Sequence, residues 1–308
     1  MELIIKLISP WHRGAFVYSD VRFDTEIPIE QADGVLWEHS IDERILEYKG
    51  IKGWYATEPS WHSMYRQGLY RRAKKVLKAH EFFHFAHTDL RYRVPHITHY
   101  NHIDNFLESG GRRHECVAIV SNAGGRFWFC RPGLRLRNTF ITNERVQLFG
   151  RRAGWESFYG FGLTWRSGFP KSYKGELGWI KWGSEEQIEF LSGFKVNVCM
   201  ENAIEPHYFS EKLYNAVRAG CVPIYHGHPT LRTGILRGLI YVDPEDYKFE
   251  PNAAFDAALS MNIQEVQAIN RVWLQKDDVR ITNFDSVWSR LAAILRHQKL
   301  YSDSHFEQ

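Results

Sequence analysis

The stretch FKVNVCMENAIEPHYFSEKLYNAVRAGCVPIYHGHP, residues 194–229, contains a complete strand–helix–strand pattern. Alternating apolar residues at its start predict a buried strand that ends in Glu201 and Asn202. Ser210 is a typical helix N-cap and Gly220 a typical helix stop, so a helix is expected between them. The apolar run VPIYHG that follows predicts the next strand. Units of this kind form a parallel sheet covered by helices, which makes an α/β fold the prediction.

The carboxyl end of the first strand is where an open α/β sheet binds its ligand. The N-terminus of the next helix favours an anion there, and Lys212 adds a positive charge suited to a pyrophosphate. Glu211 can accept hydrogen bonds from ribose or sugar hydroxyls. A purely structural role as N-cap and helix-dipole residue explains Ser210 and Glu211 equally well. It does not explain Lys212, because a lysine in the first turn opposes the dipole.

The rest of the chain extends this pattern over two domains, since 308 residues exceed what one hydrophobic core usually supports. We expect a first domain over 1–110 and a second over 111–284, with the Gly-rich segment 108–115 as linker. A helix and tail over 285–308, capped by Asp285, are expected to pack back on the first domain. The segment 151–183 has no clear periodicity and is interpreted as a long loop. Other expected strands are 2–8, 34–38, 81–87, 116–122, 146–150 and 239–243, and a further helix is expected at 60–79.

The composition is that of a soluble globular protein, with 44% apolar and 24% charged residues and a net charge of +3. This small charge gives no support for a nucleic-acid partner. Aromatic residues make up 15%, which suits either a Trp-rich core or sugar binding. The four cysteines lack CxxC spacing and are expected to be reduced thiols. No signal peptide and no stretch of about 20 apolar residues is present, so a cytoplasmic protein is expected.

The predicted helix 60–79 has one strongly basic face. A solvated helix face is the ordinary interpretation of such a pattern, and peripheral contact with an anionic membrane or a phosphate-bearing acceptor is the alternative. The basic residues are Arg71, Arg72, Lys74, Lys75 and Lys78.

The stretch 194–229 resembles the donor-binding signature of the GT10 α1,3/α1,4-fucosyltransferases. That family has a YKF-type strand, then E-N, then Y-x-[ST]-E-K, then a helix leading into VP and G. Weaker similarities are SNAGG (121–125), LRN (136–138) and VQLFG (146–150), and in the first domain WYATEPS (54–60) and HTDLRYRVP (87–95). The residues matching the main signature are Phe194-Lys195, Glu201-Asn202, Tyr208, Ser210-Glu211-Lys212, Val222-Pro223 and Gly227.

The resemblance implies a GT-B-like architecture, with two Rossmann-type domains facing a central cleft. It implies inverting transfer of fucose from GDP-fucose to a hydroxyl of an oligosaccharide or glycoconjugate, most simply in α1,3 linkage. Glu58 would be the general base, and Arg137 and Lys212 would stabilise the pyrophosphate. Partial burial beside aromatic residues would raise the pKa of Glu58 and so suit it to act as a base. The alternative interpretation is that Glu58 is a surface carboxylate before a helix. The donor-binding residues carried over are Arg137, Lys195, Glu201, Asn202, Tyr208, Ser210, Glu211 and Lys212.

Two sequence features bear on metals. No D-x-D motif occurs, which agrees with a metal-independent donor site and no cofactor beyond the donor. The run HEFFH (80–84) matches the H-E-x-x-H pattern of zinc proteases, which works only on a helix. The aromatic residues favour a strand, where His80 and His84 would lie about 13 Å apart. We therefore expect no metal site, and we give His226 and His228 no catalytic role.

The sequence departs from the family at a few positions. Gln147 stands where the family has Asp, and Pro59 follows Glu58 directly. Two alternatives therefore stay open: a GT-B transferase that uses another nucleotide sugar, and a non-catalytic carbohydrate-binding relative.

Overall fold

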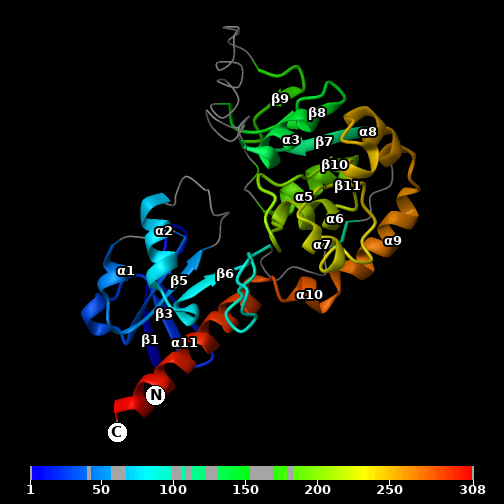
Figure 1. Cartoon of the computed structure of the whole chain (residues 1–308). Coiled ribbons are helices and arrows are strands. Elements are labelled where there is room, and N and C mark those ends of the chain that lie inside the picture. Colours follow the sequence, from blue (N-terminus) through cyan, green and yellow to red (C-terminus); the bar gives the residue numbers. More distant parts are fainter. Residues whose placement is uncertain are drawn as a thin grey trace. The chain divides into compact units, whose positions relative to one another are not determined.

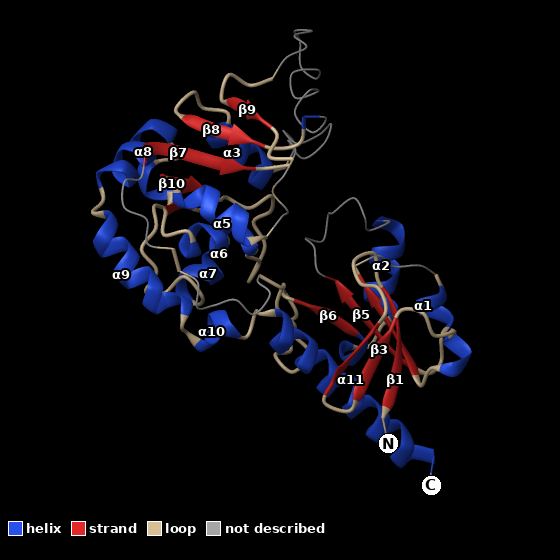
Figure 2. Ribbon diagram, turned by 180° about the vertical axis from the view of Figure 1, so that it is seen from behind, coloured by secondary structure: helices blue, strands red, loops and turns tan. Residues whose placement is uncertain are grey.

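The computed structural model describes residues 2–39, 43–56, 67–98, 106–107, 113–121, 131–152, 169–178, 180 and 183–306. The chain divides into two compact units, the first formed by 1–101 with 281–308 and the second by 102–280 (Figure 1). Each unit contains a sheet flanked by helices (Figure 2). The sheet of the first unit is mainly parallel and that of the second unit is parallel throughout. No helix in the described ranges is long and apolar enough to cross a membrane.

The sheet of the first unit has the strand order β2-β3-β1-β4-β5-β6. Only the β2–β3 pair is antiparallel, and the other pairs run parallel. The strands are β1 (Leu3–Ile8), β2 (Ala15–Tyr18), β3 (Val21–Asp24), β4 (Gly34–Glu38), β5 (Ile51–Ala56) and β6 (Phe82–His84).

Helices cover both faces of this sheet, because successive side chains of a strand point to opposite faces. In β4, Leu36 packs in the cluster that contains Trp288 of α11 (Phe284–Phe306). Its neighbours Val35 and Trp37 pack with Leu69 of α2 (Gln67–Val76) instead. The remaining elements of the unit are α1 (Arg44–Glu47) and the 3-10 turns η1 (Ile29–Gln31) and η2 (Ala79–Glu81).

The second unit has a five-stranded parallel sheet in the order β11-β10-β7-β8-β9. Cys116 and Ala118 of β7 pack against α8, whereas Val117 packs against α5 on the other face. The strands are β7 (Arg113–Ile119), β8 (Val146–Phe149), β9 (Tyr173–Gly175), β10 (Phe194–Val198) and β11 (Val222–Ile224). The helical elements are α3 (Pro132–Ile141), α5 (Glu185–Ser192), α6 (Glu211–Arg218), α7 (Pro229–Thr233), η4 (Pro244–Tyr247), α8 (Pro251–Ser260), α9 (Ile263–Leu274) and α10 (Asp277–Arg280).

Several local predictions were wrong. The segment 151–183 contains strand β9, which pairs in parallel with β8. The run 239–243 forms only a single bridge, between Val242 and Ile224. Strand β7 begins at Arg113, inside the expected linker. Asp285 does not cap α11, because Asn283 accepts the hydrogen bond from the amide of Ser286 at 2.6 Å.

Three side-chain predictions can be compared with the described residues. Cys116, Cys199 and Cys221 are buried free thiols, as expected, and Cys130 lies outside the described residues. His80 and Glu81 lie in the 3-10 turn η2 and His84 ends β6, so H-E-x-x-H does not lie on one α-helix. On α2 and just beyond it, Arg71, Arg72, Lys75 and Lys78 are exposed, and membrane contact through them stays a prediction.

Candidate functional site

The strand order of the second unit reverses between β7 and β10, since β8 and β9 follow on one side and β11 on the other. Ligands of open α/β sheets bind beyond the carboxyl ends of the strands at such a switch point. A small cavity of about 20 Å³ lies there, enough for roughly one water molecule. Its lining residues are Ile119, Val120, Gln187, Leu191, Asn197, Val198, Cys199, Lys212 and Asn215.

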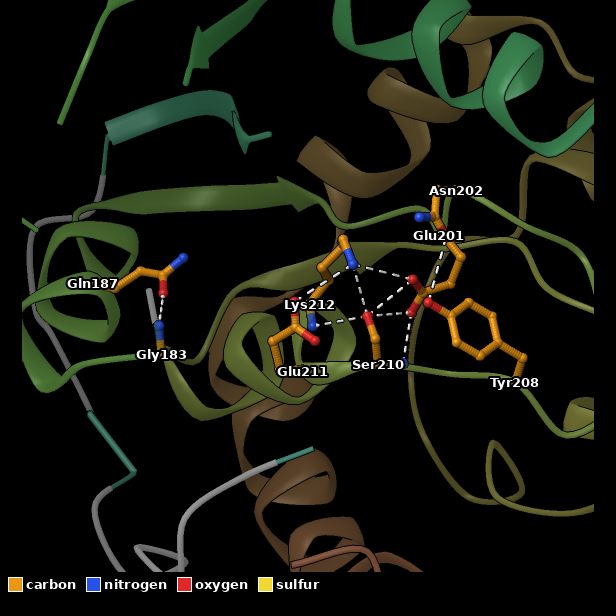
Figure 3. Close-up of polar contacts among 8 residues, drawn as sticks. All are labelled: Gly183, Gln187, Glu201, Asn202, Tyr208, Ser210, Glu211 and Lys212. Atoms are coloured by element: carbon orange, nitrogen blue, oxygen red, sulfur yellow. Dashed lines mark hydrogen bonds and ion pairs between the residues drawn. The ribbon is translucent and has the colours of Figure 1, made fainter. Parts of the chain in front are cut away.

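Glu201 lies just after β10 and is only 2% exposed. Its carboxylate accepts hydrogen bonds from the amide of Ser210 at 2.7 Å and from the hydroxyl of Ser210 at 2.8 Å (Figure 3). A buried carboxylate requires such partners, since its desolvation is otherwise very costly. Glu201 therefore anchors Ser210, the N-cap of α6, to the end of strand β10. These two residues support the start of the helix at the site.

Lys212 lies in the first turn of α6 beside this carboxylate. Its Nζ lies 3.3 Å from Glu201 Oε2 and 2.9 Å from Ser210 Oγ, and it also contacts Glu211 Oε1 at 3.4 Å (Figure 3). The pairing with Glu201 explains why a lysine is tolerated against the helix dipole. The Lys212 side chain is 17% exposed and borders the cavity, so part of it stays accessible to a ligand.

Arg137 comes from α3 and is 4% exposed. Its Nε and Nη2 donate to Oδ1 of the adjacent Asn138, at 3.2 and 3.1 Å. Burial lowers the pKa of Arg137 to about 10, although the charges of Glu201 and Tyr208 act to raise it. The guanidinium is therefore protonated at neutral pH, and burial increases its attraction for an anion.

Close packing at Gly133 brings the first turn of α3 against the loop that follows β10. A Cβ atom at this position would lie only 3.1 Å from Ala203 Cα, a contact tighter than most, so a larger residue would require a small local shift of the helix or the loop. In the same loop the Tyr208 hydroxyl lies 3.4 Å from Asn202 Oδ1. The structure thus brings together Arg137, Glu201, Asn202, Tyr208, Ser210, Glu211 and Lys212 from α3, the 199–210 loop and α6.

Lys195, which was expected in the site, is not part of this group. Lys195 lies at the start of β10, at the opposite end of the strand, and its Nζ donates to the carbonyl of Leu259 at 2.5 Å. This bond closes the last turn of α8, which is a structural role, so Lys195 is left out of the proposed site. Glu58 lies outside the described residues, which resume at Gln67 after Ala56.

Sequence reasoning missed several polar residues near the cavity. Asn197 and Asn215 are buried and line it, and the Gln187 side chain accepts from the amide of Gly183 at 2.5 Å. An asparagine inside the apolar run FKVNV was the available signal for Asn197. Tyr225 was also missed: burial, followed by the nearby Glu201 charge, raises the pKa of its hydroxyl.

One cluster resembles a metal site by residue type. His226, Asp243 and Glu245 could each offer a ligand atom within 4.8 Å of the others. However, Arg232 Nη2 donates hydrogen bonds to the carboxylates of Asp243 and Glu245. In addition, His226 Nδ1 lies 2.8 Å from Asp243 Oδ1. The Arg232 guanidinium therefore already provides a positive charge between these carboxylates.

Gln147, which stands where the resembled family has Asp, has a local structural role. Its side-chain amide donates a hydrogen bond to Glu115 of the neighbouring strand at 2.7 Å.

Comparison with known proteins gives fold-level matches over nearly the whole chain. No model of a known protein family matches. A stretch of 49 residues, 16% of this chain, is 41% identical to α-(1,3)-fucosyltransferase B of Drosophila melanogaster, and covers 11% of that protein's length. The structure is similar to that of an α1,3-fucosyltransferase, with a TM-score of 0.55, 15% identity, and coverage of 96% of this chain and 90% of the other.

A second structural match is the DNA-modifying β-glucosyltransferase, whose substrate is uridine diphosphoglucose. Here the TM-score is 0.51 with 10% identity, and the alignment covers 95% of this chain and 100% of the other. At these identities the likeness concerns the fold. The chain has the α/β fold with parallel sheets of GT-B glycosyltransferases.

Proposed function

We propose that the protein is an inverting glycosyltransferase that moves fucose from GDP-fucose to a hydroxyl of a glycan, in α1,3 linkage. The observation that carries this proposal is the group formed by Lys212, Arg137 and Glu211 at the switch point of a GT-B sheet. Two cations at the carboxyl end of β10 suit a pyrophosphate, and Glu211 suits the hydroxyls of a ribose. The signature over 194–229 makes GDP-fucose the donor of choice.

The proposed reaction is a single displacement. Glu58 takes the proton of the acceptor hydroxyl while that oxygen attacks the anomeric carbon of the donor. The bond from this carbon to the pyrophosphate oxygen breaks on the opposite face, and GDP leaves with the electron pair. Lys212 and Arg137 then stabilise the negative charge on the leaving group without proton transfer. Glu201 and Ser210 act as positioning residues, because their contacts hold Lys212 at the start of α6.

A different nucleotide sugar is the second candidate donor. The structural likeness to an enzyme that uses uridine diphosphoglucose favours it, since the same fold accommodates both nucleotides. A non-catalytic carbohydrate-binding relative is the third alternative, in which Glu58 has no role as a base.

Release of nucleoside diphosphate from a donor panel separates these alternatives. We expect the protein to release GDP from GDP-fucose when N-acetyllactosamine is present, and to release no UDP from UDP-glucose or UDP-N-acetylglucosamine. Release of UDP alone would assign the other nucleotide class. Absence of release from all donors, together with retained glycan binding, would identify a binding protein.

A further inference from the structure

The first unit contains a polar cluster at the switch point of its own sheet. Strand order reverses between β1 and β4, because β3 and β2 continue on one side of β1 while β5 and β6 follow β4. Ser9 and His12 follow β1, and Glu38 ends β4. The cluster therefore lies at the position where an open α/β sheet forms its ligand crevice. None of these residues belongs to the fucosyltransferase signature or to the proposed donor site.

The cluster is built around a buried carboxylate. His12 Nδ1 lies 2.6 Å from Glu38 Oε2, and the Ser9 hydroxyl also donates to this oxygen. The carboxylate accepts the Nδ1 proton, which leaves Nε2 as the other polar atom of the ring. Of the two ring nitrogens of His12, only Nδ1 has a hydrogen-bond partner among the described residues, and the side chain is 17% exposed. The carboxylate fixes the orientation of the imidazole, whose ring packs edge-on against Trp288 at a centroid distance of 5.0 Å.

An exposed tryptophan lies in the same loop. Trp11 is 62% exposed, and its ring centroid is 5.8 Å from that of His39. The Ser9 hydroxyl oxygen accepts from the amides of Trp11 and His12, at 2.9 and 3.0 Å, and so ties the loop to the cluster. The indole of a tryptophan combines a large apolar face with a polar N–H group. An exposed indole beside fixed polar atoms is suited to a sugar ring, which has both an apolar face and hydroxyls.

An open cleft of about 600 Å³ lies beside the cluster; Ser9 is the cluster residue that lines it, and Trp11, His12 and Glu38 lie next to this lining in the chain or through their contacts with Ser9. Its volume lies within the range of small-ligand sites. Basic and acidic side chains both line it, including Arg13 and Glu26, and Arg13 donates to the carbonyls of Ser9 and His12. A lining of both signs suits a neutral ligand with many hydroxyls better than an anion.

We propose that Trp11, His12 and Glu38 form the subsite for a neutral sugar of the acceptor. The Trp11 indole stacks on the apolar face of the ring, and His12, oriented by Glu38, forms a hydrogen bond with one of its hydroxyls. That the sugar belongs to the acceptor rests on the proposed function. The binding of a neutral saccharide does not, since it follows from the cluster, the tryptophan and the cleft.

A glycan array that carries neutral and anionic saccharides tests this proposal with the full chain. We expect the wild type to bind neutral glycans, and Trp11→Ala and His12→Gln to lose about tenfold or more in apparent affinity. Leu90→Ala is the matched control, since Leu90 is 64% exposed in the same unit and should leave binding unchanged. Because Trp11 is exposed, its replacement should not alter the unfolding temperature, so Trp11→Ala remains informative even if His12→Gln does not fold.

The subsite would be overturned if the wild type bound no neutral glycan, or if Trp11→Ala and His12→Gln both bound neutral glycans as tightly as the wild type. A parallel titration with GDP distinguishes this failure from failure of the proposed function. GDP binding without glycan binding rejects the subsite alone. Glycan binding that depends on Trp11, without nucleotide binding, supports the subsite and rejects the transferase.

Discussion

Replacement of Glu58 by Gln is expected to lower the turnover of sugar transfer by roughly 10²–10⁴-fold, the usual contribution of a general base. The amide is nearly isosteric but cannot accept the proton of the acceptor hydroxyl. Donor binding should not change, because the proposed donor residues lie in the other unit. The measurement is kcat for GDP release from GDP-fucose with a saturating glycan acceptor, combined with the GDP dissociation constant of the variant.

The control for this substitution is Glu43→Gln, which changes an exposed carboxylate next to α1 in the same unit. It should retain the wild-type turnover. A Glu58→Gln enzyme with turnover close to that of the wild type would remove Glu58 as the base, and another group would have to accept the proton.

Replacement of Glu201 by Ala is expected to lower the free energy of unfolding by about 3 kcal/mol, as for other buried charge pairs that lose one partner. The Ser210 amide and the Ser210 hydroxyl lose their carboxylate acceptor, and Lys212 Nζ loses one of its acceptors. All of them lie at the N-terminus of α6, so the first turn of this helix loses its anchor to β10. The measurement is the midpoint and slope of the denaturant unfolding transition of the second unit, monitored with a spectroscopic probe located in that unit.

Glu189→Ala serves as the comparison, because Glu189 is an exposed carboxylate on α5 in the same unit. It should change stability by less than about 0.5 kcal/mol. If Glu201→Ala is equally mild, the buried carboxylate does not support α6, and the account of how Lys212 is positioned is wrong.

The sequence predicted those elements whose signals are local. Ser210 caps α6 and its hydroxyl accepts from the amide of Lys212, and Gly220 has a φ of +67° just beyond the helix. Both features follow from the properties of single residues. Strand β9 was missed because a three-residue strand shows no periodicity and forms through its pairing with β8. The cap of α11 was misplaced by two residues because Asn283 and Asp285 are both good capping residues.

The candidate site was predicted in part, for a similar reason. Glu201, Ser210 and Lys212 lie within twelve residues of one another, so the pattern of the motif places them together. The role of Glu201 as a buried anchor could not be predicted, because its burial depends on the packing of α6. Lys195 belongs to the same motif, but it lies at the start of β10 and therefore at the amino ends of the strands, opposite to the site.

The cluster of the first unit shows the same limit more clearly. His12 and Glu38 are 26 positions apart and meet only when β1 and β4 pair in parallel. No sequence motif joins them, and an isolated histidine followed much later by a glutamate has no specific meaning. The strand order, and with it the switch point, became known only from the folded sheet.

Calorimetric titration with GDP, in the presence of EDTA, tests the donor site most directly. We expect GDP to bind without a metal ion and UDP not to bind. Lys212→Ala should weaken GDP binding by roughly 10–100-fold, as expected for loss of a hydrogen bond to a charged group. Lys174→Ala, which removes an exposed lysine on β9, should bind as the wild type does. Failure of GDP to bind, or equal binding by Lys212→Ala, would contradict the donor site proposed at the carboxyl end of β10.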